Sequence, residues 1–293
     1  MNSVTVRVPA TSANFACGFD VLGCAWTLYD TLRYTRSDAL CFSGCGAALQ
    51  NEDNLAWRAF EAVYRGLGQT PPKVRIDIRA EIPLSRGLGS SAAVLAAGAM
   101  AANALSGAGL SKAALLELVT PIEGHPDNLA PAFFGGLVAS MRDGERVRCA
   151  PWSLHPSLRF TALYPDYTLP TAVSRAALPK QVPFSDAVFE LSRLALLPTA
   201  FRDGDLELLA LCLDDRLHQP FRRPLIDGMD EVRKAAEALG CRAFCISGAG
   251  PSLLCITDDA GFSSRLSAAV EELPHAWTVL PLSPDGTGAV QME

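Results

Sequence analysis

A short segment rich in glycine and serine, PLSRGLGSSAA at residues 83–93, could bind an anion. Backbone N–H groups at the start of a helix lack partners within the helix and carry the positive end of its dipole. Gly87 and Gly89 would let a ligand approach the backbone closely, and Ser90 and Ser91 add two hydroxyls in the first turn. The segment therefore predicts a phosphate-binding turn that leads into a buried helix.

Known phosphate-binding motifs fit this turn unequally. A Walker A loop requires a lysine and then Ser or Thr after its last glycine, but Gly89 is followed by Ser-Ser-Ala. The dinucleotide pattern G-x-G-x-x-A is matched by Gly87, Gly89 and Ala92, but it needs an acidic residue about 20 positions further on. The next acid is Glu117, which lies too far along. A small-residue turn for close helix packing remains an alternative, so the turn alone indicates an anion without identifying it.

Charged residues in two other regions could act on a small molecule. The segment EGHPDN at residues 123–128 contains Glu123, His125 and Asp127, and a His-x-Asp pair can supply a base and an acid that orients it. Arg175 in TAVSRAALP and Arg222 in HQPFRRPL could bind a carboxylate, because the planar guanidinium can bind it through two parallel hydrogen bonds.

Strands mixed with helices in both halves of the chain must position these residues. The hydrophobic patterns predict strands at residues 3–10, 74–83, 159–167, 241–248, 252–257 and 277–282. They predict helices after the glycine turn and at residues 53–66, 111–120, 185–197, 205–218, 228–239 and 261–273, with Pro121 ending or kinking the third. Turn signals without clear periodicity at residues 143–157 indicate a boundary. We therefore expect an α+β fold with two packed domains, residues 1–152 and 153–293, and a cleft between them.

Composition and charge favour a small-molecule partner. Of the 293 residues, 49% are hydrophobic and 19% are charged, which is typical of a globular protein. The net charge of -6 provides no basic surface for nucleic acid or for an anionic membrane.

The chain carries no recognisable secretion signal or membrane span. Its longest nearly unbroken apolar run, Ala92 to Leu105, is too short to cross a bilayer, and we expect a cytoplasmic protein. The nine cysteines are expected to be reduced and buried. The pairs Cys41/Cys45 and Cys241/Cys245 lack the spacing of a zinc knuckle, which argues against metal binding by thiolates.

Four motifs in order resemble those of the GHMP kinase superfamily. PLSRGLGSSAA is similar to its ATP-phosphate loop, and VPATSANFACGFDVLG at residues 8–23 resembles the amino-terminal motif of the homoserine kinases within it. GHPDNLAPAFFGGLV at 124–138 and ISGAGPSLL at 246–254 resemble the later motifs of that group. The resemblance extends over nearly the whole chain. It implies an amino-terminal domain like domain 2 of ribosomal protein S5, a ferredoxin-like carboxy-terminal domain, and ATP in the cleft between them.

The resemblance implies positions for ATP and Mg²⁺. Ser91 and Glu123 correspond to the hydroxyl and carboxylate ligands of Mg²⁺, and such a pair suits an ion that prefers oxygen and keeps several waters. This chain has a shorter spacing between Glu123 and the histidine motif than many homoserine kinases, so Glu117 is an alternative. Asn54 resembles an adenine-side asparagine, although it could simply cap a helix. The phosphate loop would supply Pro83, Arg86, Gly87, Leu88, Gly89, Ser90, Ser91, Ala92 and Ala93.

The resemblance also implies an amino-acid substrate site. Asn14 and Asp20 match positions that hold substrate, and Asp20 suits an ammonium group. The arginines would hold the carboxylate, with Arg223 as the alternative to Arg222 if the match slips by one residue. Family motifs add Thr171, and Gly248 and Gly250 in a second glycine turn, to the substrate site, and give His125 and Asp127 contact roles without assigning a base. We interpret His218 as a helix-end histidine rather than a catalyst.

The expected activity is phosphorylation of the side-chain hydroxyl of L-homoserine by Mg-ATP, a step in threonine biosynthesis, with Asp20, Glu123, His125 and Asp127 at the catalytic centre. A related kinase that acts on threonine, mevalonate or a sugar is the alternative enzyme. A nucleotide-binding sensor of the same fold that has lost turnover is the alternative outside catalysis. A homodimer is a further hypothesis.

Overall fold

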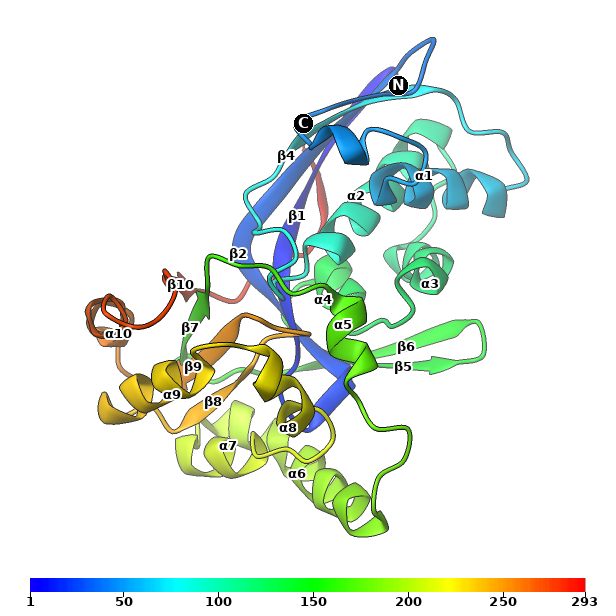
Figure 1. Ribbon diagram of the computed structural model, residues 1–293. Helices are drawn as coiled ribbons and strands as arrows, with labels where there is room; N and C mark the ends of the chain where they lie inside the picture. Colours follow the sequence, from blue (N-terminus) through cyan, green and yellow to red (C-terminus); the bar gives the residue numbers. More distant parts are fainter. Residues whose placement is uncertain (293) are drawn as a thin grey trace.

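The computed structural model describes residues 1–292 and has two β-sheets with helices packed against them (Figure 1). The larger sheet has seven strands in the order β11-β1-β2-β4-β3, with β5 and β6 joined through β2. The smaller sheet has four strands in the order β10-β7-β9-β8. This arrangement confirms the predicted α+β fold.

A long antiparallel pair, β1 (Ser3–Asn14) and β2 (Gly18–Arg36), runs through the larger sheet. The alternating residues of β1 were predicted to form a strand, and Val4, Val6 and Val8 are indeed buried. The sequence did not predict β2, which has irregular pairing opposite β1 and no simple alternation. The strands β3 (Cys41–Ser43), β4 (Val74–Arg79) and β11 (Val290–Met292) complete this part of the sheet.

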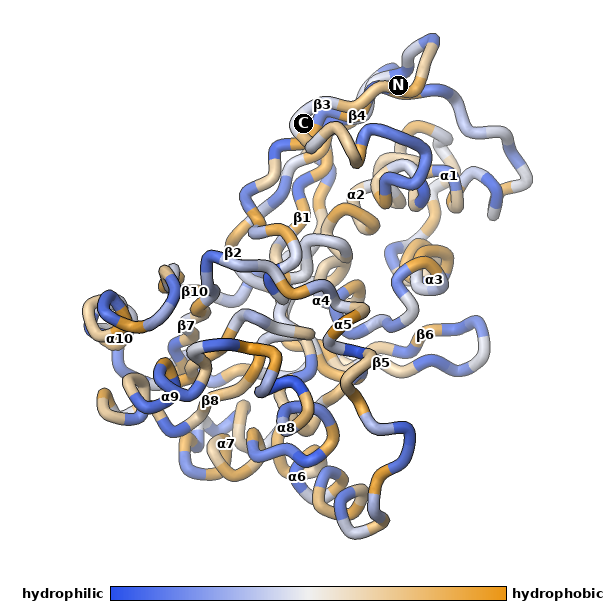
Figure 2. The backbone as a smooth tube through the Cα atoms, viewed as in Figure 1, coloured by the Kyte–Doolittle hydropathy of each residue, from blue (hydrophilic) through white to orange (hydrophobic). Residues whose placement is uncertain are grey.

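Four helices cover one face of the larger sheet (Figure 1): α1 (Leu55–Gly66), α2 (Ser90–Ser106), α3 (Lys112–Glu123) and α4 (Leu129–Phe134). The central one, α2, is buried around most of its circumference and shows mainly apolar colours in Figure 2. Its alanines and Gly98 allow close packing, since a Cβ atom at Gly98 would lie 2.4 Å from the carbonyl oxygen of Ala56. The predicted buried helix after the glycine turn is confirmed.

In the first half of the chain, the end of one helix and the length of one loop differ from the prediction. Helix α3 continues through Pro121 to Glu123 and ends at Gly124, which has a φ of 95°. The region 143–157, which we expected to be a boundary loop, contains β6 (Arg146–Trp152), which forms a hairpin with the preceding β5 (Leu137–Asp143). Most residues of β6 are exposed, so the strand lacks the apolar periodicity on which the prediction relied.

The second half is built on the smaller sheet, with β7 (Arg159–Tyr164), β8 (Ala243–Ile246), β9 (Leu253–Thr257) and β10 (Thr278–Leu282). Its helices are α5 (Thr171–Ala176), α6 (Phe184–Asp203), α7 (Leu206–Cys212), α8 (Gln219–Arg222), α9 (Met229–Ala238) and α10 (Phe262–Ala269). The single helix predicted over residues 205–218 is wrong. The chain leaves the helix after Cys212, and the Asp215 carboxylate then accepts hydrogen bonds from the backbone of Leu217, His218 and Gln219.

One hydrophobic cluster contains residues of both sheets, and a second cluster joins the smaller sheet to α9 and α10. The predicted boundary at residues 152/153 falls between β6 and β7. However, β11 pairs with β1, so the carboxy-terminal segment returns to the first sheet. The position of the domain boundary at residues 152/153 stays a prediction. Among the residues described, no helix is long and apolar enough to cross a membrane.

Candidate active site

A cavity lies where the end of β1, the turn before α2, the segment after α3, and helices α5 and α8 meet. Its empty volume is about 700 Å³, which includes space open to solvent. The lining brings together most of the residues that the sequence predicted: Asn14, Asp20, Arg86, Gly87, Gly89, Ser90, Ser91, Glu123, His125, Asp127, Thr171, Arg175, Arg222 and Gly248. Residues from both halves of the chain therefore face one cavity.

The glycine turn holds the start of α2 close to β1. Gly87 and Gly89 have φ values of 76° and 71°, which side chains other than glycine rarely adopt. A Cβ atom at Gly89 would lie 1.9 Å from the Thr11 Oγ1 atom, so no larger residue fits without a shift of the turn or the strand. Ser90 and Ser91, the first two residues of α2, line the cavity, so the start of the helix is placed where it can bind an anion.

A second glycine turn faces the first, as the sequence predicted. Gly248 and Gly250 have φ values of 58° and 82°. The hydroxyl of Ser247 lies 2.6 Å from the carbonyl oxygen of Gly87 and 2.7 Å from the Ser12 Oγ atom, and the Gly248 N–H donates to the carbonyl of Ala13. These contacts fix the smaller sheet against both β1 and the turn that begins α2.

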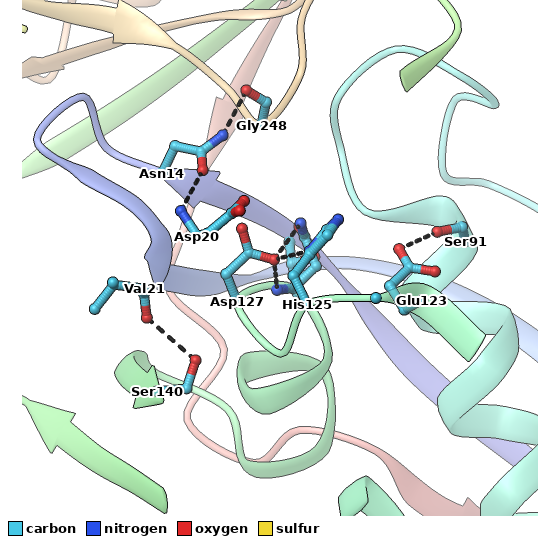
Figure 3. Close-up of polar contacts among 12 residues, drawn as sticks. Asn14, Asp20, Val21, Ser91, Glu123, His125, Asp127, Ser140 and Gly248 are labelled. Atoms are coloured by element: carbon cyan, nitrogen blue, oxygen red, sulfur yellow. Dashed lines mark hydrogen bonds and ion pairs between the residues drawn. The ribbon is translucent and has the colours of Figure 1, made fainter. Parts of the chain in front are cut away.

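Ser91 and Glu123 form an oxygen pair beside the first turn of α2. The Ser91 hydroxyl donates to the Glu123 carboxylate (Figure 3). Burial raises the pKa of Glu123, and the hydrogen bond from Ser91 partly opposes that effect. The alternative residue, Glu117, instead accepts a hydrogen bond from the backbone of Val147 at 3.2 Å. The cavity lining includes Glu123 and leaves out Glu117.

His125 and Asp127 form a second polar pair in the same cavity (Figure 3). The His125 Nδ1 atom lies 2.5 Å from the Asp127 Oδ1 atom, which also accepts a hydrogen bond from the backbone of Asn128 at 2.7 Å. Burial lowers the pKa of His125, but the contact with Asp127 and the nearby charges of Glu123 and Asp20 outweigh it, so the pKa is raised. Asp127 therefore holds the imidazole in one orientation.

Asn14 and Asp20 are fixed by each other and by the second glycine turn (Figure 3). The Asn14 side chain donates to the carbonyl of Gly248 at 2.7 Å and accepts from the backbone of Asp20 at 3.0 Å. Arg175 binds the Asp20 carboxylate through two hydrogen bonds of 2.8 and 3.0 Å. The structure thus pairs two residues that the sequence identified separately as substrate-binding.

Asp20, His125 and Asp127 also form a cluster whose ligand atoms lie within 4.8 Å of one another. A cluster of this kind could hold a cation. However, Asp20 already binds Arg175, and Asp127 already binds His125. The predicted ligands of the metal, Ser91 and Glu123, lie outside this cluster.

Arg222 is almost completely buried at the wall of the cavity, with 1% of its surface exposed. Its Nη1 atom donates to the carbonyl of Gly248 at 2.9 Å. Burial, with the nearby positive charge of Arg175, lowers the pKa of Arg222 to about 10. The alternative, Arg223, is exposed and binds Asp230 at 2.7 Å, so a slip of the motif by one residue does not fit.

A second, more apolar cavity adjoins the first, with an empty volume of about 1060 Å³ that includes space open to solvent. The two share Leu84, Ser85, Ser90 and Ser91. Asn54 lines this cavity and also caps α1, because its Oδ1 atom accepts from the backbone of Ala56. The helix cap suggested for Asn54 is therefore confirmed, whereas its place beside the adenine stays a prediction. The apolar lining comes from Leu49, Leu55, Ile78, Ala80, Ile82 and Val94.

Some predicted residues lie outside the two cavity linings. Leu88, Ala92 and Ala93 are buried in the core, and Pro83 and Gly250 also do not line either cavity. The sequence analysis missed four lining residues, which are Leu84, Ser85, Asn128 and Ala249. Asn128 and Ala249 lie inside the quoted motifs and could have been included. Ser85 has a φ of 55°, and nothing in its residue type indicates that conformation.

Comparisons with known proteins agree over the whole chain. The models of the GHMP kinases N terminal domain and the GHMP kinases C terminal region match residues 54–136 and 198–275. Homoserine kinases from Clostridium botulinum and Moorella thermoacetica are 40% and 43% identical, covering 98% and 97% of this chain and 98% of each relative. A crystal structure of homoserine kinase from Cytophaga hutchinsonii superposes with a TM-score of 0.88 at 28% identity, covering 100% of this chain and 98% of that one. The chain belongs to the GHMP kinase family and, within it, to the homoserine kinases.

Proposed function

We propose that the protein phosphorylates the side-chain hydroxyl of L-homoserine with ATP. The observation that carries this function is a single cavity with a phosphate-type helix start on one side and an acid and a buried arginine on the other. The helix start suits the phosphates of a nucleoside triphosphate, and the acid with the arginine suits an amino acid. Full-length relatives that are homoserine kinases support the same assignment.

The ATP site in this proposal spans both cavities. The backbone from Gly87 to Ser91 would hold the phosphates, and the apolar cavity beside Asn54 would take the adenine. The Ser91 hydroxyl and the Glu123 carboxylate suit Mg²⁺, because their oxygen atoms lie together. Burial disfavours the negative charge of Glu123, and a bound cation would neutralise that charge. When bound, the ion would neutralise charge on the transferred phosphoryl group.

The homoserine site in this proposal lies between the two glycine turns. Arg222 would bind the carboxylate and Asp20 the ammonium group, while Arg175 holds Asp20 in place through its two hydrogen bonds. The hydroxyl would then lie near His125 and Asp127, facing the phosphate turn across the cavity. Catalysis in this arrangement depends on positioning two substrates and on neutralising charge.

A substrate survey tests this function. Purified protein with Mg-ATP should release ADP with L-homoserine, and phosphorus NMR should show a phosphate ester on its side chain. Turnover with mevalonate, threonine or galactose but not with homoserine would replace the proposed substrate. Calorimetric binding of ATP and homoserine without ADP release would indicate a sensor instead.

We also propose a homodimer, supported by an exposed apolar stripe on α6. Phe184, Val188 and Leu191 lie at helical spacing, with 85%, 50% and 66% of their surfaces exposed. Such stripes commonly mark contacts between subunits. Light scattering during size-exclusion chromatography should give the mass of two chains, and Leu191→Glu should shift it toward one. A single-chain mass at every concentration would contradict this proposal.

A further inference from the structure

Two side chains that contact the buried Arg222, Phe19 and His218, do not line the cavity. Its guanidinium carbon lies 5.2 Å from the centre of the Phe19 ring. The imidazole of His218, which has no exposed surface, stacks on the same ring at 5.1 Å with 29° between the planes. His218 and Arg222 therefore lie side by side against one aromatic side chain.

The partners of His218 determine which ring nitrogen carries the proton. Its Nε2 atom lies 3.1 Å from the carbonyl oxygen of Ala16, which can only accept, so Nε2 carries the hydrogen. Its Nδ1 atom lies 3.4 Å from the Arg222 Nη1 atom, which can only donate, so Nδ1 is an acceptor. His218 is consequently a neutral imidazole that accepts a hydrogen bond from Arg222.

The electrostatic surroundings agree with this neutral form. Burial lowers the pKa of His218 to about 4, and the positive charge of Arg222 acts in the same direction. Asp215 and Asp20 act in the opposite direction but do not outweigh burial. A proton on Nδ1 would also face the guanidinium directly, which like charges disfavour.

These contacts decide which edge of Arg222 can face a ligand. The two hydrogens on Nη1 point to the Gly248 carbonyl and to His218 Nδ1. The buried Nε atom has no hydrogen-bond partner among residues 1–292. The edge formed by Nε and Nη2 is thus left for a carboxylate, which would satisfy the buried Nε–H group.

Asp215 fixes the position of His218 in turn. Its carboxylate accepts hydrogen bonds from the backbone of Leu217, His218 and Gln219, which are the residues that lead into α8. The same carboxylate lies 3.5 Å from His218 Nε2. The short α8, which ends at Arg222, is therefore anchored at its first turn.

We propose that His218 is a positioning residue for substrate recognition: its Nδ1 atom orients the Arg222 guanidinium so that the Nε and Nη2 edge receives the carboxylate of homoserine. This inference rests on the proposed function. It assigns His218 no contact with the reacting atoms.

A comparison of two substrates with two variants tests this role. L-homoserinamide has the same hydroxyl and amine as homoserine but lacks the carboxylate. His218→Phe keeps an aromatic ring beside Phe19 and removes the acceptor, whereas His218→Asn keeps an acceptor near the position of Nδ1. The measurements are kcat and KM for both substrates, KM for ATP, and Tm.

For His218→Phe we expect KM for homoserine to rise by about 10-fold to 100-fold, because a misplaced binding group costs about that much. KM for ATP should change less than about twofold. The ratio of kcat/KM for homoserine to kcat/KM for homoserinamide should fall by the same factor by which KM for homoserine rises. His218→Asn should retain most of the preference.

Three results would overturn the positioning role. One is an equal loss of kcat/KM for homoserine and for homoserinamide in His218→Phe. Another is a parallel rise in KM for homoserine and in KM for ATP in the same variant. The third, which applies even if His218→Phe does not fold, is a stable His218→Asn protein without the preference for homoserine. Failure of the unchanged protein to phosphorylate homoserine would instead contradict the proposed function.

Discussion

Glu123 and Glu117 lie on the same helix but have different surroundings. Glu123 contacts Ser91 at the cavity, whereas Glu117 contacts the backbone of β6. Because a glutamine at position 123 cannot carry the negative charge that a divalent ion requires, Glu123→Gln should lower kcat by roughly 100-fold. It should also raise the Mg²⁺ concentration needed for half-maximal rate.

Glu117→Gln is the matched control for this prediction. A glutamine oxygen can still accept the hydrogen bond from Val147, so kcat and the Mg²⁺ requirement should stay near those of the unchanged protein. Steady-state kinetics over a Mg²⁺ titration checks both variants. The opposite pattern, with a larger loss at Glu117, would move the metal ligand to that position.

Glu190 on α6 gives a prediction about pH. Burial raises its pKa to about 7, although the backbone N–H of Arg216 donates to its Oε1 atom. Its Oε2 atom has no hydrogen-bond partner in the part of the chain that the structure describes. The folded protein therefore favours the protonated carboxyl, whereas an unfolded chain has a pKa of about 4.3.

The sign of the effect follows from this difference. The stabilisation associated with protonated Glu190 is fully present below about pH 4.3 and is lost as pH rises through about 7. The free energy of unfolding of Glu190→Gln, relative to that of the unchanged protein, should therefore increase by about 2 to 3 kcal/mol from pH 5 to pH 8. Urea unfolding at several pH values measures this, with exposed Glu237→Gln as control. A relative stability that does not change with pH would contradict the prediction.

For single residues, the sequence predicted which side chains line the site better than it predicted which of them contact each other. Asp20 and Arg175 were each expected to contact substrate, but their mutual ion pair joins segments far apart in the chain. Nothing in either segment indicates that contact, because it depends on how the two halves pack. By contrast, the two expected Mg²⁺ ligands, Ser91 and Glu123, do contact each other, since a carboxylate at the end of its helix can reach the phosphate turn. The choice of Glu123 over Glu117 as metal ligand stays a prediction.

At the scale of elements, the two ends of α2 offer a matched comparison. Gly89 and Gly107 flank the helix with φ values of 71° and 72°. A Cβ atom at Gly107 would meet no described atom within 4 Å, whereas one at Gly89 would collide with Thr11. Thr11 is held there, because its hydroxyl donates to Asn128.

We expect Gly107→Ala to cost about 1 kcal/mol, because alanine is strained at positive φ, and to leave the KM for ATP unchanged. Gly89→Ala adds the collision and should displace the phosphate turn, which should raise KM for ATP by about tenfold or more. Urea unfolding and ATP kinetics distinguish the two effects. Equal ATP affinity in both variants would show that the turn does not bind phosphate.

The elements that the sequence predicted best have strong local signals. The start of α1 at Asn54 and of α3 at Ser111 follows from side chains that cap helices, and both caps are confirmed. The end of α7 could not be predicted, since Leu213 and later residues continue an apolar pattern. There the Asp215 carboxylate binds three backbone N–H groups and replaces the helix by a turn.

At the scale of the whole molecule, the two halves bury each other's aromatic side chains. Trp26 of the larger sheet lies 4.9 Å from Phe160 of the smaller sheet, and Phe15 lies 5.7 Å from Phe201 of α6. All four side chains are almost fully buried. The sequence predicted two packed domains. These contacts belong to a hydrophobic cluster that contains residues of both halves, whereas a second cluster lies within the second half alone. Sequence patterns do not reveal which apolar residues join the shared cluster.

We therefore expect the protein to unfold as one cooperative unit. Each large apolar side chain that loses its cover costs about 1.5 to 3 kcal/mol, and a whole domain is stable by only about 5 to 15 kcal/mol. The isolated segment of residues 1–152 would expose Trp26 and Phe15 and should lack a cooperative transition. For the full chain, urea transitions followed by tryptophan fluorescence and by far-ultraviolet circular dichroism should coincide.

Mg-ATP at about 100 times its Kd should shift the whole transition by about 2.7 kcal/mol, since its site depends on both halves. Two separate transitions, with ATP moving one of them, would show that the halves fold independently.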